Sequence, residues 1–109
     1  MKHAMQVRLL AGLLLVTPAA LAQAGNPDRG RVEAERLCKE CHQVEDAPQP
    51  WVAMPGPAFS AVARTKGMTA MALSVWFQTS HPTMPNIILK PDVRADIIAY
   101  ILSLKPQTL

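Results

Sequence analysis

Two cysteines and a histidine stand together in the segment Cys38-Lys39-Glu40-Cys41-His42, the strongest chemical signal in this sequence. Two thiols separated by two residues and followed directly by His are typical of the attachment site of haem c. The two-residue gap lets both thiols add to vinyl groups on one edge of the porphyrin. His42 then lies under the metal, where its imidazole can fill one axial position. The motif predicts a single covalent haem c that is bound through Cys38, Cys41 and His42.

Three other interpretations of the motif are weaker. A thioredoxin-type redox pair follows a strand in a βαβ unit, and the sequence has no such pattern. A zinc site needs four ligands, and after residue 24 the sequence offers only Cys38, Cys41, His42 and His81. A structural disulfide suits an exported protein, but this close spacing would strain it and would leave His42 without a role.

The first residues of the chain have the three-part layout of a secretory signal peptide. Lys2 and Arg8 form the positive start, residues 9–16 the short apolar core, and Ala22-Gln23-Ala24 an A-x-A cleavage site. We prefer cleavage after Ala24 and keep cleavage after Ala22 as the alternative. An uncleaved anchor is disfavoured, because the apolar run is well short of the roughly 20 residues that span a bilayer.

Removal of residues 1–24 leaves 85 of the 109 residues, a single domain over 25–109 that we expect in the periplasm. Half of the chain is hydrophobic, which excludes intrinsic disorder. The leader takes two of the 11 basic residues, so the formal net charge falls from +3 to +1. No basic cluster with interleaved aromatic residues remains, which argues against nucleic acid as a partner. A domain this small buries only about 60% of its unfolded surface and often needs a bound group for stability.

The expected secondary structure is helical, with no segment that alternates with the period of a strand. The first helix begins at 26–28, where Pro suits the first turn and Asp the positive helix end, and it continues into the haem motif. A short piece at 59–63 follows, and then a helix from the N-cap Thr69 to near Ser80, which precedes a proline. The last helix begins at Pro91 and has one apolar face, made of Val93, Ile97, Tyr100, Ile101 and Leu104. These elements predict an all-α domain of three to four helices packed around one haem.

The second axial ligand decides what the haem iron can do, and Met84 is the preferred candidate. It lies in His81-Pro82-Thr83-Met84-Pro85, far enough after His42 for the chain to return over the opposite face of the ring. The flanking prolines limit the entropy that this loop loses on ordering. His81 stays as the alternative ligand, although a His at this position more often caps the preceding helix or faces solvent.

The other methionines of the mature chain are expected to pack rather than bind iron. Met68 and Met71 lie at a helix start, where methionine is usually core filler. Met54 lies in a proline-rich loop soon after the haem motif, and we expect it to pack on the His42 side.

These residues together resemble the class I cytochromes c, in particular the small bacterial monohaem members, from Gly30 to Leu104. The resemblance implies that Gly30 lets the first helix pack closely on the last. It also implies that Gly56-Pro57 supplies a carbonyl that accepts a hydrogen bond from His42, which would orient the imidazole and raise its basicity. Met84 falls at the position of the distal ligand in this family.

Two positions depart from the family pattern, and neither touches the iron. Ala34 stands where many members have an aromatic residue against the last helix, which implies a thinner contact. Lys90 replaces the usual Ser or Thr N-cap of that helix, at a cost of about 1 kcal/mol.

The motif and the resemblance imply a periplasmic one-electron carrier, an electron-transfer protein rather than an enzyme, with redox proteins as its partners. An apolar shell would keep water from the iron. Its members would be the aliphatic stripe of the last helix together with Leu37, Phe59, Trp76 and Tyr100. A cytochrome subunit of a periplasmic dehydrogenase or oxidase is the alternative, which an exposed apolar patch and Trp51 in its proline-rich loop would favour. A ligand-binding or peroxidatic haem protein is the weakest reading, because the sequence supplies few distal acid–base groups.

Overall fold

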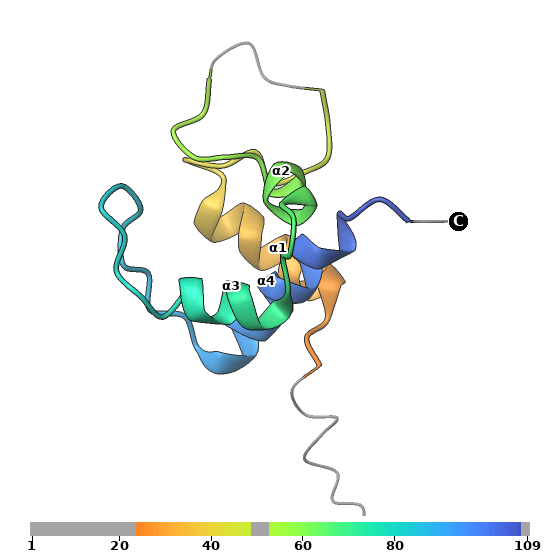
Figure 1. Cartoon of the computed structure of the whole chain (residues 1–109). Helices are drawn as coiled ribbons and strands as arrows, with labels where there is room; N and C mark the ends of the chain where they lie inside the picture. The colour runs from red at the N-terminus through yellow and green to blue at the C-terminus, as the bar shows by residue number, and fades with distance from the viewer. Residues whose placement is uncertain (1–23, 49–52, 108–109) are drawn as a thin grey trace, which may run out of the picture.

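The computed structural model of the chain describes residues 24–48 and 53–107, and this part contains four helices and no strand. These are α1 (Pro27–Cys38), α2 (Phe59–Arg64), α3 (Ala70–Trp76) and α4 (Pro91–Ser103). Figure 1 shows α1 and α4 crossing at the centre, with α2 above the crossing and α3 at its lower left in this view. The all-α prediction is therefore confirmed. Residues 1–23 of the predicted leader and Trp51 lie outside the described residues.

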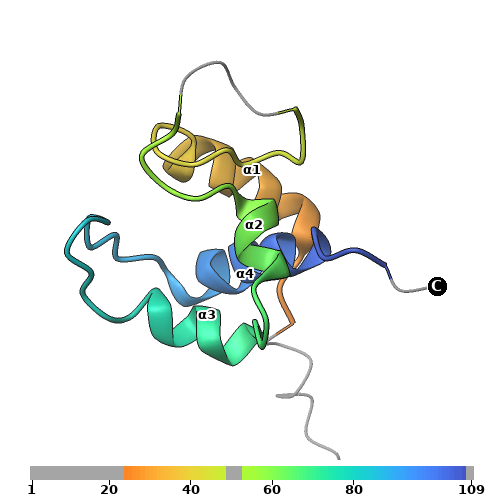
Figure 2. The same cartoon turned by 45° about the horizontal axis from the view of Figure 1, so that its top comes forward.

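The α1–α4 crossing is the centre of the fold, and α2 and α3 also pack on α4 (Figure 2). Gly30 is buried where α1 meets α4, and a Cβ atom there would overlap the backbone carbonyl of Asp96. Ala34, one turn further, is fully buried. The absence of a side chain at Gly30 thus permits the close approach of the two helices, as expected.

Local sequence signals set the start of α1. The side-chain oxygen of Asn26 accepts a hydrogen bond of 3.0 Å from the backbone N–H of Arg29, and Pro27 occupies the first turn. Both features satisfy or remove N–H groups that have no partner within the helix. The predicted start at 26–28 is confirmed.

A buried carboxylate that the sequence pattern did not reveal joins these two helices. Asp96 is only 6% exposed, and it accepts hydrogen bonds from Arg29 Nε at 2.8 Å and Nη2 at 3.1 Å and from the Asn26 backbone N–H at 2.6 Å. The hydrogen bond from Arg29 holds the pKa of Asp96 below its usual range, and the bond from Asn26 adds to this effect. Apolar periodicity marks Ile97 beside it but gives no signal for a carboxylate whose partners are distant in sequence.

The predicted apolar stripe of α4 faces the core. Ile97, Tyr100 and Ile101 are buried, while Val93 and Leu104 are partly buried against them. The Tyr100 hydroxyl donates a 2.9 Å hydrogen bond to the carbonyl of Val44, which ties the segment after α1 to this helix. Lys90 occupies the N-cap position of α4, and its side chain makes no capping hydrogen bond, as expected for a residue that replaces Ser or Thr.

Helix α3 begins as predicted but ends earlier. Thr69 accepts a 3.1 Å hydrogen bond from the Ala72 N–H, which confirms its role as N-cap. The helix stops at Trp76 rather than near Ser80, because side chains take up its last carbonyls. Gln78 Nε2 donates to the Ser74 carbonyl at 2.8 Å, and Thr79 Oγ1 donates to the Val75 carbonyl at 3.0 Å. These side-chain hydrogen bonds occupy carbonyl groups to which backbone N–H groups would donate if the helix continued.

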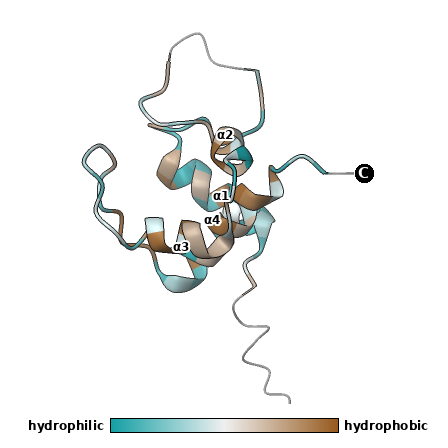
Figure 3. Cartoon of the chain, viewed as in Figure 1, coloured by the Kyte–Doolittle hydropathy of each residue, from teal (hydrophilic) through white to brown (hydrophobic). Residues whose placement is uncertain are grey.

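The expectation for the two methionines at this helix was half wrong. Met68 is partly buried against the core, but Met71 is 73% exposed. Most of α3 is nevertheless hydrophobic in sequence, as Figure 3 shows. None of the helices in the described part has the length and apolar character needed to cross a membrane.

Candidate functional site

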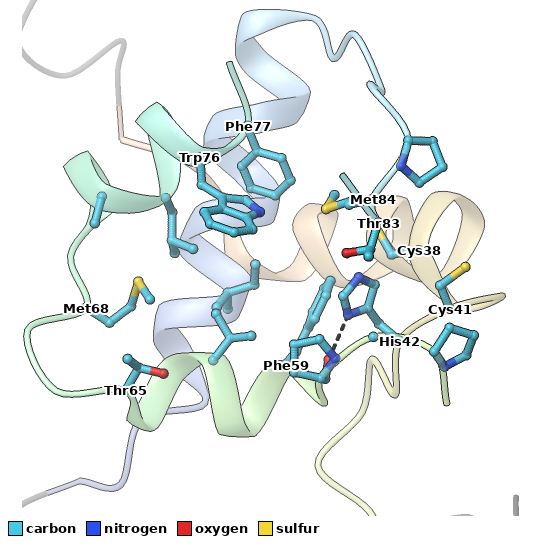
Figure 4. Close-up of a pocket in the computed structure, with 18 residues that line it drawn as sticks. Cys38, Cys41, His42, Phe59, Thr65, Met68, Trp76, Phe77, Thr83 and Met84 are labelled. Atoms are coloured by element: carbon cyan, nitrogen blue, oxygen red, sulfur yellow. Dashed lines mark hydrogen bonds between the residues drawn. The ribbon is translucent and has the colours of Figure 1, made fainter. Parts of the chain in front are cut away.

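An apolar cavity of about 400 Å³ lies between the helices and the two loops that follow α1 and α3. Its size falls in the range of about 300–1,000 Å³ that is typical of cofactor and ligand sites. Figure 4 shows side chains from several elements around it. Its hydrophobic walls include Phe59 from α2, Leu73 and Trp76 from α3 and Ile101 from α4.

Both cysteines of the motif line this cavity at the end of α1. Cys38 is the last residue of the helix, and its carbonyl accepts hydrogen bonds from the N–H groups of Cys41 at 3.2 Å and His42 at 2.9 Å. This turn brings the two sulfurs and the imidazole to one side of the cavity (Figure 4). Cys38 is buried and Cys41 is exposed. Burial raises the pKa of the Cys38 thiol to about 11, with a smaller contribution from Cys41.

The imidazole of His42 is held in one orientation. Its Nδ1 lies 2.7 Å from the carbonyl oxygen of Pro57, shown by the dashed line in Figure 4. A carbonyl only accepts hydrogen bonds, so Nδ1 carries the proton and Nε2 keeps its lone pair. The ring also packs against Phe59 at 5.2 Å between centroids, and a Cβ atom at Gly56 would overlap it. The hydrogen bond that the resemblance implied for Gly56-Pro57 is thus confirmed.

Met84 reaches the same cavity from the loop that follows α3. Its neighbours Thr83 and Pro85 line the cavity too, so a continuous stretch of this loop forms part of the wall. Figure 4 shows the Met84 thioether and the His42 imidazole both directed into this space. The structure therefore brings together Cys38, Cys41, His42 and Met84, the residues that the sequence singled out.

The competing ligand candidates lie differently. His81, the alternative ligand, is not among the residues that line the cavity. Its Nε2 is 2.8 Å from the Trp76 carbonyl oxygen, so it caps α3, which is the more usual role of a histidine at such a position. Met54 and Met71 are also outside that set, whereas Met68 lines the cavity. Met68 is thus the one methionine besides Met84 in the described part of the chain that faces this space.

The walls differ in part from the predicted apolar shell. Phe59 and Trp76 line the cavity as expected, but Leu37 and Tyr100 pack into the protein core instead. Residues that were not predicted to form the wall also line it, among them Val62, Thr65, Met68 and Ala72. For Val62, the three-residue spacing from Phe59 along α2 was a usable signal, because such positions share a helix face.

The residues present fit a haem c group. Two thiols stand at one edge, an imidazole offers an unprotonated Nε2, and a thioether enters from a separate segment. Thiols, imidazole and thioether are the groups that attach and ligate haem in c-type cytochromes. The surrounding walls are apolar, which suits the porphyrin.

Comparison with known proteins decides the family. The chain is 32% identical over 94 residues to cytochrome c-552 of Bradyrhizobium diazoefficiens, and the match covers 86% of this chain and 89% of that protein. The chain belongs to the small c-type cytochromes. No protein-family model and no solved structure matches this cytochrome.

Membership of this family confirms the fold expected from the resemblance, with helices packed around a haem pocket. It also establishes that this cytochrome is an electron-transfer protein rather than an enzyme, and that its cofactor is covalently bound haem c. Electron transfer requires redox partners, which dock on the cytochrome to donate or accept the electron.

Proposed function

We propose that this cytochrome is a periplasmic one-electron carrier whose haem iron is ligated by His42 and Met84. The observation that carries the proposal is the entry of these two side chains into one cavity from segments far apart in sequence. Cys38 and Cys41 would attach the porphyrin through thioether bonds at the edge beside His42. When bound, the haem supplies an iron that changes between ferric and ferrous states by one electron.

Each ligand residue has a distinct physical task. The Pro57 carbonyl keeps the proton of His42 on Nδ1, which leaves Nε2 as the metal-binding atom and raises its basicity. The soft thioether of Met84 would favour ferrous iron and so raise the reduction potential. If His42 and Met84 both hold the haem iron, they would leave it no position for exogenous ligands.

The walls of the cavity serve the same reaction. Phe59, Leu73 and Ile101 are buried and apolar, and they limit the access of water to the iron. Limited access of water would reduce the solvent rearrangement that accompanies a change in the charge of the iron.

We further propose that residues 1–24 are a signal peptide cleaved after Ala24, and that residues 25–109 act in the periplasm. Contacts at the start of this domain support the boundary. A side chain at Gly25 would overlap the backbone carbonyl of Ala95, and the Asn26 N–H bonds to Asp96, so the packed fold reaches back to Gly25. The intact mass of the protein from the periplasm tests this boundary: a chain beginning at Gln23 or at Met1 would contradict it.

The ligand assignment is tested by substitution of the two methionines that line the cavity. Met84→Ala should open the ferrous iron to carbon monoxide and lower the reduction potential. Met68→Ala is the matched control, because it removes a thioether from the same cavity but should leave both properties close to those of the unsubstituted protein. An unchanged potential in Met84→Ala, or a loss of ligation in Met68→Ala, would reject Met84 as the ligand.

A second candidate function is a cytochrome subunit of a periplasmic dehydrogenase or oxidase. Exposed apolar side chains favour it: Ile88 is 98% exposed in the segment after α3, and Met71 and Val75 are exposed on α3 itself. Gentle purification followed by sedimentation analysis separates the two functions. A free carrier sediments as a single chain with haem, whereas a subunit sediments with its enzyme.

A further inference from the structure

His81 lies at the junction between α3 and the loop that carries Met84. Its Nε2 is 2.8 Å from the carbonyl oxygen of Trp76, the last residue of α3. Because a carbonyl only accepts, Nε2 carries a proton and donates it to this oxygen. The same nitrogen is 3.3 Å from Thr79 Oγ1. The bond to Trp76 ties the loop back to the end of the helix five residues earlier.

The imidazole also stacks on the indole of Trp76. The two ring centroids are 3.5 Å apart and the planes are 12° from parallel. Trp76 lines the haem cavity, yet it is 50% exposed, so the surrounding core holds it only in part. Figure 4 shows its indole beside the cavity. The stack on His81 is therefore an additional contact that holds the exposed Trp76 side chain.

The chain between His81 and Met84 is short and stiff. Pro82 fixes its own φ angle and restricts His81 to extended backbone. Beyond Met84, Asn86 Nδ2 donates a 3.2 Å hydrogen bond to Ser80 Oγ, which closes the loop at its base. A fixed His81 thus limits the positions that the Met84 side chain can take, and loss of its contacts would leave the Asn86–Ser80 bond to hold the loop at its base.

We propose that His81 is a positioning residue for the axial ligand: its stack on Trp76 and its bond to the Trp76 carbonyl hold the Met84 loop at the haem cavity. His81 acts through these contacts and does not bind the iron. The inference rests on the proposed ligation by His42 and Met84. In this role His81 holds the loop that carries Met84 and does not compete with Met84 for the iron.

The experiment compares haem-loaded variants well below their melting temperatures. The readouts are the sulfur-to-iron charge-transfer band of the ferric protein and the rate at which carbon monoxide binds the ferrous protein. His81→Ala should weaken the band and speed carbon monoxide binding at least tenfold. His81→Gln should fall between, because an amide can donate to the Trp76 carbonyl but cannot stack as an aromatic ring does.

Thr69→Ala is the matched control for a merely structural effect. It removes the hydrogen-bonded cap at the other end of α3. This variant should lower the melting temperature but leave the band and the carbon monoxide rate unchanged. If Thr69→Ala and His81→Ala alter these readouts equally, or if His81→Ala alters neither, the positioning role is rejected. Should His81→Ala fail to fold, His81→Gln decides by the same criteria.

Met84→Ala, measured in parallel, separates the two proposals. A band that persists in Met84→Ala rejects Met84 as the ligand and the role of His81 with it. A band that disappears in Met84→Ala but is unaffected in His81→Ala and His81→Gln rejects only the positioning role.

Discussion

At the scale of single residues, the site depends on how His42 is held. One hydrogen bond to the Pro57 carbonyl sets which ring nitrogen carries the proton, and packing against Phe59 limits rotation of the ring. Gly56 lies so close to the ring that no side chain fits between them. The ring nitrogen that would bind iron is therefore oriented by neighbouring protein groups.

The close approach of Gly56 to His42 gives a direct prediction. Gly56→Ala places a methyl group closer to the imidazole than van der Waals contact allows. The ring must therefore move, and its hydrogen bond to the Pro57 carbonyl must lengthen. We expect a loss of about 1–3 kcal/mol in the free energy of unfolding and faster solvent exchange of the Nδ1 proton in NMR spectra. Ala53→Ser, at an exposed position of the same loop, should change neither. Slow exchange of that proton in Gly56→Ala would contradict the account.

At the scale of secondary-structure elements, the crossing of α1 and α4 holds the two ends of the domain together. Gly30 provides close contact, and Asp96 adds charge-assisted bonds to Arg29 and to the chain just before α1. The haem motif continues directly from the end of α1. The position of this helix on α4 consequently sets the position of Cys38 and His42.

The contact at Gly30 predicts a clear cost for a single methyl group. Gly30→Ala should reduce the free energy of unfolding by about 1–3 kcal/mol, because overlap with the Asp96 carbonyl outweighs the gain of about 1 kcal/mol that Ala brings to a helix interior. Val32→Ala, at a 57% exposed position of the same helix, is the control and should stay within about 0.5 kcal/mol. Denaturant titration of both haem-loaded variants measures the difference. Equal stability of the two would show that the helices can separate freely at Gly30.

The depressed pKa of Asp96 predicts how stability depends on pH. A carboxylate whose pKa is lower in the folded state stabilises the fold above its unfolded pKa of about 3.9, and this contribution is lost as the pH falls through the folded value. The melting temperature should therefore drop below about pH 4, and Asp96→Asn should show a weaker dependence in that range. Asp92→Asn, at an exposed position of α4, is the control. If the melting temperature of Asp96→Asn falls as steeply below about pH 4 as that of the unsubstituted protein, the Asp96 carboxylate does not account for the acid sensitivity.

The sequence predicted those elements whose signals are local. Asn26 and Thr69 mark helix starts because a capping side chain bonds within its own first turn. The early end of α3 was missed, because it depends on which carbonyls Gln78 and other side chains reach. Asp96 was missed because its partners lie 67 and 70 residues away in sequence. The exposure of Met71 likewise depends on what packs on α3, which no local pattern states.

The candidate site was more predictable than its walls. The haem motif and the proline-flanked Met84 carry fixed spacings, whereas a wall residue such as Val62 or Ala72 is recognised only once the helices are placed. The same holds for the stack of His81 on Trp76. The residues that carry chemistry are recognised from local motifs, whereas the residues that form the walls are determined by contacts between segments distant in sequence.

At the scale of the whole molecule, the domain is small and contains a cofactor pocket that is lined in part by α1 and α4. The described helices surround an apolar cavity of about 400 Å³, which the haem c of this cytochrome family fits. A domain of this size buries little apolar surface apart from its contacts with the haem, so few other contacts stabilise the fold. Haem attachment and folding should therefore be coupled.

This coupling predicts the result of removing both attachment thiols. Cys38→Ser combined with Cys41→Ser should leave little folded protein, because the haem supplies much of the apolar contact at the centre. Substitution of Lys39 and Glu40 by Ala keeps both thiols and is the control, which should bind haem and fold. Circular dichroism during thermal melting gives the comparison. A stable and cooperatively folded double-serine variant would contradict the coupling.

The proposed closure of the haem iron by the thioether of Met84, with His42 as the other ligand, can be tested by one measurement. The optical spectrum of the purified ferric protein provides that test, through the weak sulfur-to-iron charge-transfer band. The account predicts that this band is present in the unsubstituted protein. Its absence would mean that His81 or no side chain fills the position, and a ligand-binding or catalytic haem protein would then be the better interpretation.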